Sequence, residues 1–233
     1  MSQLQVDDRS TRTIRSFVKR TGRLTKSQRY ALEEYWPCYG IDFQPDQQVD
    51  FSALFTNPGC IKLEIGFGNG DSLVEMANKD PSCCYIGIEV HDPGVGHCLK
   101  RIHDQGLTNL KLISHDAVEV LESMIPVASL DAVFLFFPDP WHKKRHHKRR
   151  IVNQAFRDVL VNVMKTGAVL HMATDWLDYA EHMAGELLSD VRFSNTGNEF
   201  GFVDKPQYRP ETKFERRGLR LGHEVRDLVF RKK

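Results

Sequence analysis

Short apolar runs alternate with helix-like segments along most of the chain, and this alternation limits the possible folds more than any other feature. The runs predict strands at residues 61–65, 85–90, 110–114, 131–137 and 168–173, with a last clear strand at 225–230. Strands separated by helices of this length are joined by crossovers, which place them parallel in one sheet. Both alternations of the runs are apolar, as expected for strands covered on both faces. We therefore predict an α/β fold with a mostly parallel sheet and helices on both faces.

Three helix ends are predicted from single residues. Asp71 is a candidate N-cap for a helix at 72–78, because a carboxylate can accept the first free backbone N–H groups. Gly106 is expected just after a helix at 93–105, and Gly167 is expected to close a helix at 151–164, since glycine readily takes the left-handed conformation there.

Two segments concentrate positive charge, although the formal net charge of the whole chain is only +1. The first is a run of cations with no acid between them: Arg9, Arg12, Arg15, Lys19, Arg20, Arg23, Lys26 and Arg29. The second is 143–150, which combines Lys and Arg with two histidines. Local positive fields on a near-neutral protein suit a phosphate backbone. We predict a basic, flexible arm at 1–30 and one folded domain at 31–233.

The five cysteines are odd in number and include no C-x-x-C pair, so neither a disulfide framework nor a thiolate zinc site is indicated. We expect a reducing compartment, hence the cytoplasm. The early residues lack the apolar core of a signal peptide and no later run is long enough to span a membrane, so no membrane partner is expected. The histidines around residue 146 lie among cations without a nearby pair of carboxylates, and we expect no metal.

A glycine-rich turn, G-F-G-N-G, follows the first predicted strand. Its glycines, Gly66, Gly68 and Gly70, allow positive φ and close approach to a ligand. A dinucleotide-binding turn would read G-x-G-x-x-G, but this chain has Asp71 at the last position, where an acid would repel a pyrophosphate. The turn therefore suits a cationic or neutral ligand better than a pyrophosphate. S-adenosylmethionine carries an ammonium and a sulfonium, and Glu64 just upstream can add a carboxylate. The alternative is a glycine-rich turn that binds no ligand.

Acidic residues follow three further strands, at the edge where parallel sheets bind ligands. Glu89 ends the second strand and could accept both ribose hydroxyls of an adenosine. Asp116 follows the third strand and could bind an adenine amino group, cap the next helix, or do both. Asp139 lies between two prolines after the fourth strand, and these hold its carboxylate outward. Trp141 beside it could stack on a base or pack in the core.

Six motifs of this chain occur together in one family. They are LEIGFGNG, GIEVHDPGVG, HDAVEVL, FFPDPWHKKRHHKRR, HMATDW and RPETKFERRGLRLGH. Together they resemble the bacterial tRNA (guanine-N7-)-methyltransferases, the TrmB family, from about residue 20 to residue 230. The resemblance implies a class I adenosylmethionine-dependent methyltransferase with a Rossmann-like sheet. It also implies methyl transfer to N7 of the guanosine at position 46 in the variable loop of tRNA, with residues 31–233 as the catalytic domain. The family contains monomers and dimers, so the assembly stays open.

The resemblance also implies roles for individual residues. The residues that would contact adenosylmethionine, besides the glycine turn, are Glu64, Glu89, Asp116 and Asp139. Asp139 would also be the catalytic residue. The substrate would be contacted by Lys143, Asp175, Thr212, Lys213, Phe214 and Glu215. The RNA would be contacted by Arg145, His146, His147, Lys148, Arg149 and Arg150.

The chemistry of guanine limits what the catalytic residue has to do. N7 carries a free lone pair on the major-groove edge, so it needs no general base to attack a methyl group. The product ring is cationic, and Asp139 is expected to stabilise that charge rather than to remove a proton. Two alternatives stay open. One is methylation of an amino group on adenine or protein, because Asp-Pro-aromatic motifs also hold exocyclic amines. The other is a non-catalytic RNA-binding or NAD-linked domain, although Asp71 argues against NAD.

Overall fold

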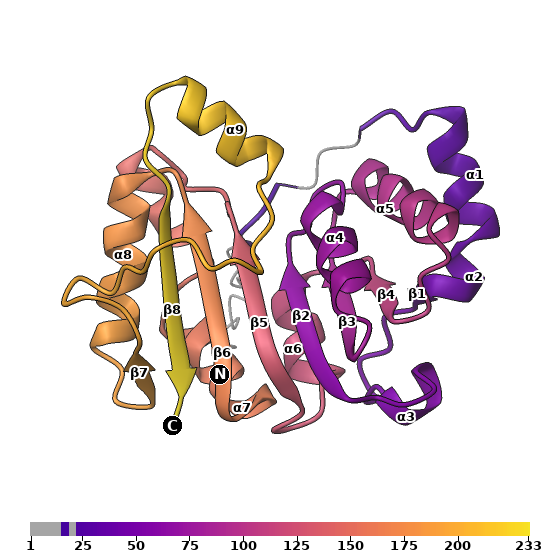
Figure 1. Cartoon of the computed structure of the whole chain (residues 1–233), viewed down its shortest axis with the longest axis horizontal. Helices are drawn as coiled ribbons and strands as arrows, with labels where there is room; N and C mark the ends of the chain where they lie inside the picture. The colour runs from indigo at the N-terminus through magenta and orange to yellow at the C-terminus, as the bar shows by residue number, and fades with distance from the viewer. Residues whose placement is uncertain (1–14, 19–21) are drawn as a thin grey trace, which may run out of the picture.

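The computed structural model describes residues 15–18 and 22–233, so two stretches of the predicted arm at 1–30, residues 1–14 and 19–21, lie outside the described residues. The described strands form one sheet in the order β1-β4-β3-β2-β5-β6-β8-β7. Their bounds are β1 Gly40–Ile41, β2 Cys60–Ile65, β3 Cys83–Ile88, β4 Leu110–Ile113, β5 Leu130–Phe136, β6 Met164–Thr174, β7 Phe193–Asn195 and β8 Arg226–Lys232. Strands β1 to β6 pair in parallel, and β8 is antiparallel to β6 and β7. The predicted α/β fold with a mostly parallel sheet is confirmed (Figure 1).

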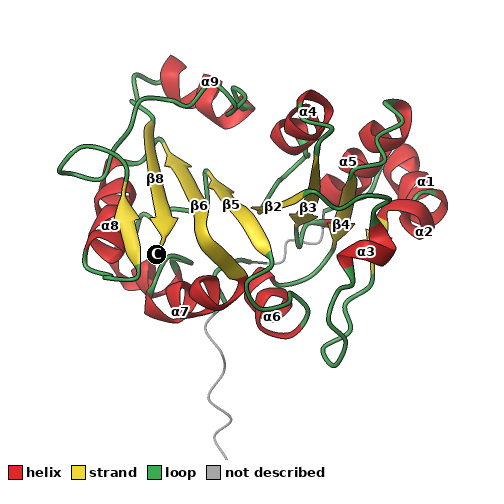
Figure 2. Ribbon diagram, turned by 60° about the horizontal axis from the view of Figure 1, so that its bottom comes forward, coloured by secondary structure: helices red, strands yellow, loops and turns green. Residues whose placement is uncertain are grey.

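Helices cover both faces of the sheet, as predicted. They are α1 Lys26–Glu34, α2 Trp36–Tyr39, α3 Phe51–Leu54, α4 Asp71–Lys79, α5 Asp92–Asp104, α6 Ala117–Ser123, η1 Lys144–Arg149, α7 Gln154–Val163, α8 Leu177–Leu188 and α9 Lys213–Arg220. Helices α6, α7 and α8 share one apolar cluster with the sheet, which includes Leu63 and Phe156. Helices α1, α4 and α5 share a second cluster, which includes Leu73 and Leu99. Figure 2 shows α6 and α7 on one side of the sheet and α4 on the other.

The chain between β7 and α9 crosses the sheet on the side of α4 (Figure 1). Tyr208 in this segment lies with its ring 6.0 Å from that of Phe134, and its hydroxyl is 2.9 Å from Nδ1 of His171. His171 is fully buried on β6, and its Nε2 is 2.7 Å from Oδ1 of Asp227 on β8. The segment is therefore held to the sheet largely by polar contacts instead of an apolar stripe.

Two of the three predicted helix ends differ from the structure. The N-cap of α4 is Gly70, with φ of 77°, and Asp71 is the first helical residue. A side chain at position 70 would collide with Cys98, because its Cβ would lie 2.3 Å from the sulfur. Gly167 does not close a helix but lies inside β6 with φ of 81°, where the pairing with β5 is irregular. Gly106 follows the C-cap of α5 with φ of 62°, as predicted.

A disulfide joins Cys60 and Cys83, which corrects the expectation that none is indicated. These residues begin the neighbouring strands β2 and β3 and are direct partners in the parallel register, with Cα atoms 4.7 Å apart. The pairing is a consequence of topology, because two strands joined by a helix bring residues that are distant in sequence side by side. Counting cysteines and their short spacings gives no access to that register.

Helix α1 packs against α5 instead of belonging to a separate arm. Gln28 of α1 donates from Nε2 to the carbonyl of Pro93 at 3.0 Å, and its backbone leaves no room for a side chain at Gly96. The predicted boundary at residue 30 thus falls inside a helix that is docked on the domain. Among the described residues, no helix has the length and apolar character needed to cross a lipid bilayer.

Candidate active site at the carboxyl edge of the sheet

The glycine turn between β2 and α4 has positive φ at all three of its glycines. The φ values are 71° at Gly66, 60° at Gly68 and 77° at Gly70. A Cβ at Gly66 would meet no atom of the described residues within 4 Å, so this position faces open space in that part of the chain. Asp71, just after the turn, forms an ion pair with Arg101 of α5. The acid at the helix start is thus already partnered within the protein.

Glu89, just after β3, holds the glycine turn in place. Its Oε2 accepts from the backbone N–H of Gly68 at 2.8 Å, and its Oε1 accepts from Val90 at 2.7 Å and from His91 at 3.0 Å. Each carboxylate oxygen can accept two hydrogen bonds. Three of its four acceptor positions are thus used, and Glu89 can accept one further donor from a ligand, on Oε2, while it orders the turn.

A cavity of about 390 Å³ opens beside the turn, at the carboxyl ends of β2, β3 and β5. Gly66, Glu89 and Asp139 all line it, so the structure brings these three predicted residues together. Asp116 is not a lining residue, although both its neighbours are. Its carboxylate caps α6 by accepting from the N–H of Val118 at 2.9 Å, as predicted.

Glu64 lies behind the glycine turn and does not line the cavity. Its side chain is buried, with Oε1 accepting from Ser72 at 2.7 Å, and Oε2 has no partner among the residues that the structure describes. Burial raises the pKa of Glu64 to about 7, against the lowering effect of the Ser72 hydrogen bond and with a smaller contribution from the charge of Glu89. The carboxylate is poised to become more acidic if a cation is bound nearby.

Residues 15–18 close one side of the same cavity, which the sequence did not indicate. Ser16, Phe17 and Val18 line it. The indole N–H of Trp141 donates to the carbonyl of Ser16 at 3.1 Å. Arg149 donates to the carbonyls at positions 15 and 17, at 3.1 and 3.2 Å, and its guanidinium lies 4.3 Å from the centre of the Trp141 ring. In this structure the guanidinium of Arg149 therefore binds the backbone at residues 15 and 17 instead of being left free to bind a phosphate.

The turn that carries Asp139 is bounded by two non-glycine residues with positive φ. Phe137 has φ of 52° and Trp141 has φ of 50°. Such conformations are uncommon for large residues and are often found at functional sites. The Oδ1 of Asp139 accepts from the backbone N–H of Trp141 at 3.0 Å, which fixes the carboxylate over the turn.

The basic segment after this turn forms the short helix η1, and its members differ in exposure. Lys143, Lys144, Arg145 and Lys148 are exposed. Partial desolvation and the surrounding cations, Arg145 foremost, lower the pKa of His146, so this ring adds little positive charge at neutral pH. Arg150 departs from the prediction of an RNA contact, because its side chain is only 3% exposed and is bonded within the protein.

The predicted substrate residues on and before α9 divide into two groups. Thr212 and Glu215 are buried and cap the helix reciprocally. Glu215 also pairs with Arg209, and these contacts lie inside the protein. Lys213 and Phe214 are exposed, and the Phe214 ring lies 6.5 Å from that of Phe137. Only the second group is exposed on the surface of the protein.

Helix α9 lies beyond the carboxyl ends of β5 and β6 (Figure 1). It packs on Asp175, since a Cβ at Gly218 would be 2.7 Å from Oδ2 of that residue. Asp175 is also 3.3 Å from Nδ1 of His223. The outer face of α9 carries further exposed cations, Arg216, Arg217 and Arg220. The carboxyl edge thus has exposed positive charge both on η1 and on α9.

Comparison with known proteins identifies the family. Residues 58–228 match the family model described as "Putative methyltransferase". The tRNA (guanine-N(7)-)-methyltransferase of Yersinia enterocolitica is 55% identical over 97% of this chain and 94% of its own length. The enzyme of the same name from Aeromonas hydrophila is 55% identical over 97% of this chain and 95% of its own.

Solved structures support the fold at much lower identity. TrmN from Thermus thermophilus aligns with a TM-score of 0.53 and 15% identity, over 76% of this chain and 45% of that one. The 16S rRNA methyltransferase KamB aligns with a TM-score of 0.54 and 15% identity, over 80% of this chain and 95% of that one. These confirm the methyltransferase fold, and the high identity to full-length relatives confirms the resemblance carried by the motifs. The chain belongs to the tRNA (guanine-N7-)-methyltransferase family.

Proposed function

We propose that this protein transfers a methyl group from S-adenosylmethionine to N7 of a guanosine in tRNA, at position 46 of the variable loop. The observation that carries the proposal is the place of Asp139. It lines the same cavity as Gly66 and Glu89, and the exposed cations of η1 begin only a few residues further on. A cofactor cavity, a fixed carboxylate and a phosphate-binding surface therefore meet at one edge of the sheet.

The cavity suits an adenosine carrying a positively charged tail. The open space at Gly66 lets a ligand approach the backbone, and Oε2 of Glu89 has acceptor capacity for one ribose hydroxyl. The acids around it, Glu89 and Asp139 on the wall and Glu64 behind it, favour a cation over a pyrophosphate. When bound, S-adenosylmethionine supplies an electrophilic methyl group on sulfur.

The protein's own contribution to the reaction is orientation and charge. Guanine N7 has a lone pair and no proton to lose, so the residues here need only hold it in line with the methyl group. Positive charge develops on the guanine ring as the bond forms. Asp139, held by the N–H of Trp141, is a preorganised carboxylate that favours this charge without becoming protonated.

Binding of tRNA would depend on the exposed cations on both sides of this site. Lys143 lies just before η1, Lys144, Arg145 and Lys148 lie on it, and Lys213 with three arginines lies on α9. Neutralising backbone phosphates releases counterions, which makes such binding strongly dependent on salt. We further infer that the enzyme acts in the cytoplasm. Reductants there keep thiols reduced, so the Cys60–Cys83 bond is expected in the isolated, oxidised protein.

The decisive experiment is to incubate the protein with unmethylated tRNA and labelled S-adenosylmethionine, then identify the modified nucleoside by mass spectrometry. N7-methylguanosine confined to the variable loop is the expected product. A methylated adenosine would instead support amino-group chemistry, and the absence of any labelled nucleoside would support a non-catalytic RNA-binding role. Calorimetry with S-adenosylmethionine and with NAD tests the assignment of the cofactor separately.

A further inference from the structure

A single peptide group, between Pro140 and Trp141, is held at both of its polar ends. Its carbonyl oxygen accepts from Nε of Arg150 at 3.0 Å. Its N–H, contributed by Trp141, donates to Oδ1 of Asp139 at 3.0 Å. The orientation of this one peptide plane therefore decides where the Asp139 carboxylate points, and Arg150 sets that orientation from the other side.

Arg150 is built into the protein, unlike the exposed cations that precede it. Its side chain is 3% exposed, and its Nη2 atom forms an ion pair with Asp178 of α8. The same nitrogen is 3.2 Å from Nε2 of His147, and the guanidinium lies 4.8 Å from the centre of the Tyr179 ring. A guanidinium offers donors in a rigid planar fork, which suits a residue that must fix two directions at once.

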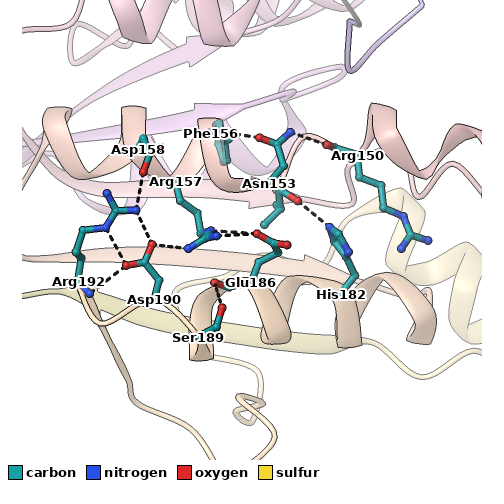
Figure 3. A network of polar contacts seen from close by, with 11 residues as sticks. Arg150, Asn153, Phe156, Arg157, Asp158, His182, Glu186, Ser189, Asp190 and Arg192 are labelled. Atoms are coloured by element: carbon teal, nitrogen blue, oxygen red, sulfur yellow. Dashed lines mark hydrogen bonds and ion pairs between the residues drawn. The ribbon is translucent and has the colours of Figure 1, made fainter.

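The backbone of Arg150 is fixed as well. Its carbonyl accepts from Nδ2 of Asn153 at 3.1 Å, and Asn153 in turn caps α7 by accepting from the N–H of Phe156 at 3.1 Å (Figure 3). The residue is thus anchored to α7 through its main chain and to α8 through its side chain. Arg150 thereby connects the turn that carries Asp139 to two helices of the domain.

The turn needs such an anchor because its backbone is strained. Phe137 and Trp141 both have positive φ, a backbone conformation that is unfavourable for large side chains. Strained turns persist only where the surroundings hold them. The hydrogen bond from Arg150 is a contact of this kind to the middle of the turn.

We propose that Arg150 is a positioning residue for methyl transfer, which holds the Pro140–Trp141 peptide so that Asp139 faces the reacting guanine. This rests on the role proposed above for Asp139. It also separates Arg150 from its neighbours in the basic segment, because its function is not to bind a phosphate. The substitution of Arg150 should therefore slow the methyl-transfer step and leave the salt dependence of tRNA binding unchanged.

The test compares Arg150→Gln and Arg150→Lys with the native enzyme in two measurements. Single-turnover methylation at saturating tRNA and S-adenosylmethionine should slow by roughly tenfold to a hundredfold for both, since small misplacements of a catalytic group have effects of this size. The tRNA dissociation constant, measured over a range of salt concentrations, should keep the native slope. Lys148→Gln is the contrast, an exposed cation two residues away whose loss should reduce the slope by about one.

A milder variant keeps the test informative if the Arg150 variants fold poorly. Asp178→Asn removes the charged partner of Arg150 at a side chain that is 60% exposed. We expect its single-turnover rate to fall as well, but by a smaller factor than in the Arg150 variants, and its melting temperature to stay nearly native. A lower melting temperature with a native rate in the folded fraction would show a structural role only and overturn the proposal. A reduced salt slope with a native rate would show that Arg150 is an RNA contact, and would also overturn it.

Asp139→Asn, measured alongside, distinguishes the two levels of the argument. If Asp139→Asn is slow and Arg150→Gln is as fast as the native enzyme, the inference about Arg150 is wrong and the role of Asp139 stands. If both variants are as fast as the native enzyme, the role proposed for Asp139 is wrong, and the inference about Arg150, which rests on it, is wrong as well.

Discussion

Arg209 and Asp227 form an ion pair inside the protein, beneath helix α9. Nε of Arg209 is 2.6 Å from Oδ1 of Asp227, and the two side chains are 0% and 3% exposed. On its other side Arg209 pairs with Glu215 of α9 at 2.7 Å. The buried guanidinium therefore joins the helix over the site to strand β8 of the sheet.

Removing this guanidinium should destabilise the protein strongly. Arg209→Met removes the cation between two buried carboxylates, which leaves Glu215 with Lys205 and Asp227 with His171. Breaking a buried ion pair in this way typically costs about 3–5 kcal/mol. Urea denaturation of Arg209→Met and of Arg216→Met makes the comparison. Arg216 pairs with Glu211 at the surface, at 3.6 Å, and its loss should change the free energy of unfolding by less than about 1 kcal/mol. Similar effects for the two variants would contradict the role of the buried pair.

The same region explains what could not be predicted from the sequence. Strands β2 to β6 and β8 are buried by apolar side chains, so their apolar runs predicted them to within a few residues, whereas the two-residue strand β1 was not predicted. Helix α9 is instead held by the charges of Arg209, Glu215 and Asp227, which leave no apolar periodicity to detect. The spacing of Thr212 and Glu215 is that of a capping box and was the one available signal for its start.

The candidate site shows the same division. Glu89 and Asp139 were found because strand ends in a parallel sheet meet at one edge, and the cavity confirms that they meet. Arg150 was grouped with the RNA contacts, because a run of cations does not reveal which one turns inward. Residues 16–18 were missed as a cavity wall since they are bound through backbone carbonyls, which carry no sequence signature.

Glu64 should make the stability of the protein depend on pH. Its folded pKa of about 7 is above its ordinary value of 4.5, so the folded state prefers the protonated acid. As the pH rises from the pKa of the unfolded state to that of the folded state and beyond, ionisation of such an acid lowers the free energy of unfolding, by up to ~3 kcal/mol in total. Glu64→Gln cannot ionise and should escape that loss. The free energy of unfolding of Glu64→Gln, minus that of the native protein, should therefore be more positive at pH 8 than at pH 5.

Urea denaturation of both proteins at these two pH values provides the measurement. A difference in unfolding free energy that is the same at both values would mean that Glu64 ionises normally in the folded state. Asp104→Asn is a suitable control, because this carboxylate is half-exposed and pairs with Lys100 on the surface of α5. Its effect should be small at both pH values.

The exposed cations of η1 should bind tRNA mainly through phosphate charge. Replacing Lys144, Arg145 and Lys148 with Gln removes three exposed positive charges without touching the cavity wall. The slope of log affinity against log salt should become shallower by about two to three. The affinity for S-adenosylmethionine should stay native. Lys79→Gln, at an exposed cation paired with Glu75 on α4, is the control and should leave the slope unchanged.

A native salt slope in the triple variant would show that these side chains are only solvated surface. The same change on α9, with Arg216, Arg217 and Arg220 replaced by Gln, asks separately whether that helix also contacts RNA. Additive effects on the slope would place phosphates on both sides of the site.

The last prediction concerns the charge of Asp139. This carboxylate lines the cavity and is held by the N–H of Trp141, in a turn with positive φ on both sides. Asp139→Asn keeps the size of the side chain and can still accept that hydrogen bond through its amide oxygen. It removes only the negative charge that favours a cationic guanine. Losing one preorganised electrostatic partner typically slows a reaction by about a hundredfold or more.

We therefore expect single-turnover methylation by Asp139→Asn to be slower by about that factor at saturating tRNA and S-adenosylmethionine. The affinity for tRNA should be close to native, because the carboxylate makes no favourable contribution to phosphate binding. Since N7 loses no proton, hydroxide at higher pH should not restore the rate, as it could if the loss of a general base were the cause. A rate within about threefold of native would contradict the electrostatic role, because it is far smaller than the expected loss. The negative charge that favours methyl transfer would then have to come from another carboxylate on the cavity wall, and Glu89 is the one in place.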